Sequence, residues 1–139
     1  MTRILTALLA VLYLGNGLAM LSAPAAWYAA VPGVAASGPY NDHFVRDIGL
    51  AYLLAGGAFA WALRRPRHLA ACAIVGSAWP ALHALVHLAE WLHHGLPPAR
   101  ILLADGLGVL APALLGLALA AWAARTPGIV ANPRGETPC

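Results

Sequence analysis

Four long apolar runs, each near the length of a membrane-spanning helix, constrain this chain more than any other feature. An α-helix rises ~1.5 Å per residue, so about 20 apolar residues cross the ~30 Å hydrocarbon core of a bilayer. Short segments rich in proline, glycine and arginine separate the runs and turn the chain. The runs predict helices at about residues 4–21, 42–63, 68–93 and 99–124. The expected fold is therefore all-α, a four-helix transmembrane bundle formed by residues 1–125.

The composition agrees with a membrane location. Of the 139 residues, 61% are hydrophobic and only 9% are charged, whereas soluble domains are about 25% charged. No basic run is interleaved with aromatic residues in a polar segment, so we expect no nucleic-acid partner. Cys72 and Cys139 lie far apart and form neither a CxxC motif nor a disulfide framework. The partner that the composition predicts is the lipid bilayer.

The placement of arginine predicts the orientation of the bundle. Cytoplasmic loops of membrane proteins carry an excess of lysine and arginine. With both termini on the inner side, only Arg46 and Arg100 lie on the outer side. The inner side then holds Arg3, Arg64, Arg65, Arg67, Arg125 and Arg134. We therefore expect a multi-pass protein with both termini cytoplasmic.

The two ends of the chain need separate interpretation. The first apolar run follows a short basic start and precedes small residues at 22–25, a pattern that also resembles a signal peptide. We favour a retained helix because the run is long for a signal peptide and because Tyr13, Asn16 and Met20 share one face. Residues 126–139 contain repeated proline and glycine and predict a disordered cytoplasmic tail.

The third predicted helix carries polar residues that its apolar surroundings do not explain. Between residues 79 and 94 it holds four histidines, one glutamate and one proline. Ionisable residues at membrane depth are rare and indicate functional sites by default. At ~100° per residue, one stripe of this helix contains His83, His87, Glu90 and His94. Pro80 removes one backbone hydrogen bond and predicts a bend just below the stripe.

Polar residues of the other predicted helices fall at a similar depth. Asn16, Asp47, His87 and Asp105 all lie roughly 6–9 Å below the outer interface when each helix spans the bilayer. We therefore hypothesise one outward-facing polar pocket between the helices. Its candidate ligand-binding or metal-binding residues are His83, His87, Glu90, Asp47 and Asp105. Its candidate supporting residues are His43, Asn16, Arg46 and His94.

Several uses of this pocket stay open at the level of sequence. Imidazole and carboxylate groups suit a divalent metal ion, whereas haem fits less well because only His43 opposes the third helix. Histidines and carboxylates also relay protons, or hold the polar head of a lipophilic ligand such as a quinone. The cluster would otherwise serve only helix packing, in an accessory subunit of a larger membrane complex or in a homo-oligomer. HExxH and a second ExxH are absent, so neither a zincin nor a di-iron bundle is predicted, and no motif identifies a reaction.

Several short segments resemble a family of small bacterial four-helix integral membrane proteins, similar in layout to DoxX-like proteins. These segments are Asn16-Gly17-Leu18, Trp27-Tyr28, Val31-Pro32-Gly33, residues 38–49, residues 79–83 and residues 87–90. The resemblance covers residues 3–125 and implies the four-helix fold and a location in the bacterial inner (plasma) membrane. DoxX-like proteins include members linked to quinone-coupled redox chemistry and to membrane complexes. No motif in this chain carries that activity over.

Overall fold

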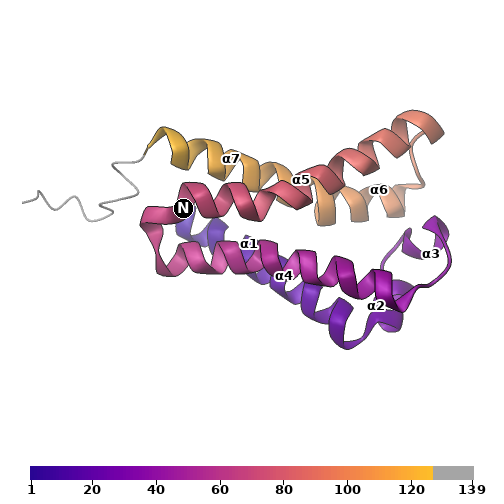
Figure 1. The fold of residues 1–139 in the computed structure, drawn as a ribbon. Coiled ribbons are helices and arrows are strands. Elements are labelled where there is room, and N and C mark those ends of the chain that lie inside the picture. The colour runs from indigo at the N-terminus through magenta and orange to yellow at the C-terminus, as the bar shows by residue number, and fades with distance from the viewer. Residues whose placement is uncertain (127–139) are drawn as a thin grey trace, which may run out of the picture.

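The computed structural model describes residues 1–126, which are helical almost throughout and contain no β-strand (Figure 1). In chain order the elements are α1 (Thr2–Ser22), α2 (Pro24–Ala30), α3 (Val34–Ser37), α4 (Asp42–Arg64), η1 (Pro66–His68), α5 (Leu69–His94), α6 (Ala99–Asp105), η2 (Gly106–Leu110) and α7 (Ala111–Arg125). The all-α fold class is confirmed. The tail predicted at residues 126–139 lies, apart from its first residue, outside the described residues.

Three helical stretches are long and apolar enough to cross a membrane, namely Thr2–Ser22, Pro66–His94 and Ala99–Arg125. Their length and apolar composition agree with a membrane protein. The remaining long helix, α4, has 23 residues but carries charged residues near both ends, and it is not one of these three stretches.

Each of the four long helices, α1, α4, α5 and α7, packs mainly against the one that precedes or follows it in the chain. α1 lies against α4, α4 against α5, and α5 against α7 (Figure 1). The core forms where the four helices meet, and each helix contributes at least one side chain that is no more than 3% exposed. These include Tyr13, Phe59, Ala73 and Leu119. The centre of the molecule is therefore closed by direct side-chain packing.

Glycines allow α1 and α4 to approach closely. A Cβ atom at Gly17 would lie 2.6 Å from the carbonyl oxygen of Gly49, and one at Gly56 would lie 2.7 Å from the backbone nitrogen of Leu14. The obstructing atoms belong to the backbone and cannot rotate away. The seam between α1 and α4 therefore depends on residues without a side chain.

Two prolines modify the helices of the second half. Pro80 lies inside α5, and this helix changes direction midway along its length (Figure 1). Pro112 has no N–H for the carbonyl of Gly108, and its ring would clash with that carbonyl in a regular α-helix. The π-helical turn η2 precedes Pro112 and avoids this clash by changing the local hydrogen-bond pattern. The predicted helix at 99–124 is thus one continuous helical stretch with a π turn inside it.

Two adjacent glycines of α4 provide a matched test of the α1–α4 seam. We expect Gly56→Ala to lower the free energy of unfolding by about 1–3 kcal/mol, because an added methyl group forces backbone shifts. A Cβ atom added at Gly57 would meet no other atom within 4 Å. Gly57→Ala should therefore leave that free energy unchanged or raise it by about 0.5–1 kcal/mol, because alanine favours the helix. Denaturant titration in detergent, followed by circular dichroism, measures both variants. Equal free energies of unfolding for the two variants would contradict close packing of α1 against α4 at Gly56.

Candidate functional site

A chain of three polar side chains joins α5 to α6. Asp105 Oδ2 lies 3.1 Å from His87 Nδ1, and the side chains of Asp105 and His87 are 12% and 20% exposed. On its other side, His87 Nε2 lies 3.4 Å from His83 Nε2. His83 and His87 are four residues apart in α5, so both rings lie on the same helix face. We refer to Asp105, His87 and His83 as the histidine chain.

With Asp105 ionised and both imidazole rings neutral, the two contacts select one tautomer of each histidine. His87 donates its Nδ1–H to the carboxylate, because a carboxylate can only accept. The Nε2 atom of His87 is then the acceptor, and His83 donates its own Nε2–H. This leaves His83 Nδ1 as an acceptor, and it has no hydrogen-bond partner among residues 1–126. The free end of the chain is therefore a hydrogen-bond acceptor.

An aromatic row holds His83 from the side of the core. The His83 ring stacks on Trp79, with ring centroids 4.9 Å apart and an interplanar angle of 11°. Trp79 in turn meets Tyr52 of α4 edge-on at 4.9 Å, and Tyr52 lies 5.8 Å from Tyr13 of α1. The position of His83 is therefore set by packing across three helices.

The Asp105–His87 contact is also the polar link between α6 and α5. Beyond Ala84 no residue of α5 is buried, and Asp105 is the one buried residue of α6. Asp105 is the last residue of α6 and is followed directly by the π turn η2. π turns occur frequently at functional sites. A carboxylate buried where almost nothing else is buried indicates a specific role.

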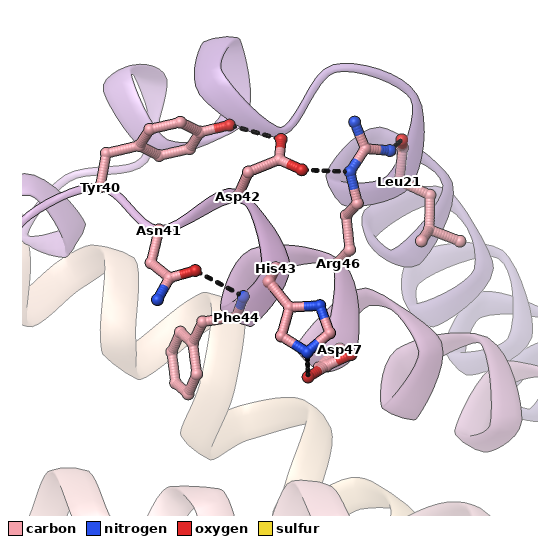
Figure 2. A network of polar contacts seen from close by, with 8 residues as sticks. All are labelled: Leu21, Tyr40, Asn41, Asp42, His43, Phe44, Arg46 and Asp47. Atoms are coloured by element: carbon pink, nitrogen blue, oxygen red, sulfur yellow. Dashed lines mark hydrogen bonds and ion pairs between the residues drawn. The ribbon is translucent and has the colours of Figure 1, made fainter.

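Two of the predicted ligand residues are not joined to the histidine chain. Asp47 contacts His43, with His43 Nε2 3.3 Å from Asp47 Oδ2 and both side chains largely exposed (Figure 2). Glu90 is exposed and makes no hydrogen bond or ion pair within the described part of the chain. Across residues 1–126, no group of three or more His, Cys, Asp or Glu side chains is arranged to hold a metal ion. The described residues therefore do not assemble the expected five-residue metal shell.

The predicted supporting residues act locally. Asn16 accepts a hydrogen bond from Trp27 Nε1 at 2.8 Å, which attaches α2 to α1. His94 is the exposed last residue of α5 and has no polar partner among residues 1–126. His43 serves only the exposed pair with Asp47. None of these three contacts the histidine chain.

Arg46 ties the start of α4 to the end of α1. Its guanidinium donates to Asp42 at 2.7 Å and to the carbonyl of Leu21 (Figure 2). Tyr40 donates to the same carboxylate at 2.8 Å. This hydrogen bond to Asp42 raises the pKa of Tyr40 above its usual value. The cluster closes the loop that carries α2 and α3, and it has a structural function.

Sequence reasoning missed Trp79 and Tyr52 as parts of the site. Trp79, His83 and His87 follow one another at intervals of four residues, which places them on one helix face. That spacing was the signal for Trp79. Tyr52 had no comparable signal, because its contact with Trp79 depends on how α4 and α5 pack.

Comparison with known proteins does not identify this chain. No protein-family model, no curated protein and no solved structure matches it. The resemblance to DoxX-like proteins therefore stays an expectation, and the interpretation of the site rests on its geometry.

Two substitutions at His87 separate its link to Asp105 from its imidazole chemistry. His87→Ala removes the donor to Asp105 and leaves a buried carboxylate without a partner, so it should lower the free energy of unfolding by about 1–3 kcal/mol. His87→Asn places an amide N–H near the position of Nδ1 and should retain most of this stability. Denaturant titration in detergent measures both variants. The control is His93→Ala, at an exposed position of the same helix. If His87→Ala lowers the free energy of unfolding no more than His93→Ala does, the contact between His87 and Asp105 does not stabilise the protein.

Proposed function

We propose that this is a multi-pass protein of the bacterial inner membrane whose histidine chain exchanges a proton with the polar head of a lipophilic ligand, such as a quinone. The observation that carries the proposal is the contact series from Asp105 through His87 to His83. It joins two helical stretches that are each long and apolar enough to cross a membrane. Ionisable side chains at membrane depth cost free energy and therefore indicate a functional site by default.

The bonding pattern describes how such an exchange would proceed. A ligand hydroxyl gives its proton to His83 Nδ1, and His83 passes its Nε2 proton to His87. His87 then carries the positive charge 3.1 Å from the Asp105 carboxylate. The reverse sequence delivers a proton to a ligand oxygen. Asp105 is therefore a positioning and charge-stabilising residue, and His83 is the residue that touches the ligand.

The surroundings of His83 favour a ligand that arrives through the membrane. Leu82, Leu85 and Val86 are each more than half exposed, so a wide apolar surface flanks the histidine along α5. A separate cavity of about 160 Å³ lies between residues 81–88 of α5 and residues 110–117, and its lining residues are alanine or leucine without any residue of the histidine chain. The exposed apolar side chains beside His83 therefore carry this point, because they suit a ligand with a small polar head and an apolar tail.

A second candidate is a non-catalytic subunit of a larger membrane complex or of a homo-oligomer. The observation that favours it is the burial pattern, in which Asp105 is the one buried residue of α6 and pairs with His87 of α5. The histidine chain would then serve only to fix these two helices. The His87→Asn variant, which keeps the hydrogen bond to Asp105 but lacks the imidazole, separates the two candidates. It should lose ligand binding under the first candidate and remain functional under the second.

We also propose that α4 crosses the membrane, so that four helices span it with both termini cytoplasmic. α4 is about as long as α1 and packs between two stretches that are apolar enough to span. Reporter fusions after Arg67 and Arg125 should read cytoplasmic, and fusions near Gly38 and Leu96 should read periplasmic. A periplasmic readout at Arg67 would reject this topology.

Ligand binding tests the proposed site. A short-chain benzoquinol, whose hydroxyl group can donate to His83 Nδ1, should change the tryptophan fluorescence of the detergent-purified protein saturably, because Trp79 lies against His83. His87→Asn keeps the donor to Asp105 but cannot carry the proton, so we expect its affinity to fall by roughly tenfold or more. His93→Asn serves as the matched control and should bind like the wild type. If His87→Asn binds as tightly as the control, the accessory-subunit candidate is favoured.

A further inference from the structure

Five arginines gather at the end of the molecule opposite the histidine chain. The antiparallel contacts set this register, because Gly17 lies against Gly49 and Ser77 lies close to Gly116. Continuing these pairings along the helices brings both chain ends of the bundle level with the α4–α5 turn, and Figure 1 shows this arrangement. The residues at this end are Arg3, Arg64, Arg65, Arg67 and Arg125, which we call the arginine end.

The arginine end has no acidic partner in the part of the chain that the structure describes. Asp42 and Asp47 lie near the start of α4, Glu90 lies near the end of α5, and Asp105 ends α6, so all four are far along the helices from the α4–α5 turn. All five arginines are exposed. Arg67 Nε donates to His68 Nε2 at 3.0 Å, a contact with a neutral acceptor that leaves the positive charge uncompensated. The patch therefore keeps a concentrated positive charge.

Two tryptophans indicate which kind of surface this end meets. Trp61 and Trp122 each precede an arginine, Arg64 and Arg125, by three residues. Their side chains are exposed, with relative accessibilities of 54% and 37%. Tryptophan is enriched at the interface between hydrocarbon and headgroups. If both tryptophans lie at this interface, Arg64 and Arg125 lie about one helical turn further out, toward the lipid phosphates.

The side-chain chemistry selects phosphate. Every basic residue of this chain is arginine, and lysine is absent. The planar guanidinium presents paired N–H donors that match two phosphate oxygens, which the ammonium group of lysine does not do. Arg64 at the end of α4, the next residue Arg65, and Arg67 of η1 would contact the same headgroup from one turn of the chain.

We propose that the arginine end is a binding site for an anionic phospholipid, whose phosphate is held mainly by the α4–α5 turn through Arg64, Arg65 and Arg67. Basic pockets at the ends of membrane helices bind such headgroups. The proposal depends neither on the histidine chain nor on which side of the membrane this end faces. Its ligand is a lipid, because the two interfacial tryptophans place the patch at the membrane surface.

Binding of defined lipids to the delipidated full-length protein in detergent tests this proposal. Phosphatidylglycerol should bind saturably, as measured by native mass spectrometry, and should raise the melting temperature, whereas phosphatidylcholine should do neither. Each of Arg64→Gln, Arg65→Gln and Arg67→Gln leaves four arginines at this end and should weaken phosphatidylglycerol binding about fivefold. Higher salt should weaken it further.

Arg100→Gln is the matched control, since Arg100 is exposed at the opposite end of the bundle, and it should bind phosphatidylglycerol like the wild type. Inorganic phosphate at the same concentration should leave the melting temperature unchanged. Equal binding of the two lipids, or equal affinities of all four variants, would overturn the site. Stabilisation by inorganic phosphate equal to that by phosphatidylglycerol would overturn the assignment to a lipid.

Discussion

The cost of leaving a polar group unpaired in apolar surroundings governs this structure. Backbone groups are satisfied within helices, because a bilayer offers no water to replace them. Two buried polar side chains follow the same rule: Thr6 donates to the carbonyl of Thr2 at 2.8 Å, and Asp105 pairs with His87. The hydroxyl groups of Tyr13 and Ser77 do not, since they are buried without a partner among the described residues. The one buried carboxylate of the described residues is therefore a group for which the structure does supply a partner.

The helical segments were predictable because apolar runs and the proline, glycine and arginine residues between them can be recognised from local sequence alone. Residues 42–63 and 99–124 were expected to be helical, and the structure has helices over Asp42–Arg64 and Ala99–Arg125. The π turn before Pro112 was not expected, although the missing N–H of proline is visible in the sequence. Packing order was less accessible, because it depends on close contacts such as the one between Gly56 and the backbone of Leu14.

The candidate site was predictable in part, and the reason is geometric. Helical periodicity gives the depth of a residue and its face on its own helix, so His83 and His87 were placed together correctly as neighbours in space. Depth alone suggested that both Asp47 and Asp105 would approach them. The structure joins Asp105 to His87, whereas Asp47 pairs with His43 on an exposed surface. Equal depth does not fix the direction in which a side chain points.

The two ends of α5 differ in how firmly they are held, and this difference bears on function. Toward its start, α5 packs at Gly76 against Phe59, which is fully buried. Toward its end, α5 has no buried residue beyond Ala84, and Asp105 is the one buried residue of α6. A weakly packed region opens at low free-energy cost and suits ligand exchange. Because Trp79 connects His83 to the buried Tyr52, the histidine chain keeps a fixed base while its surroundings can move.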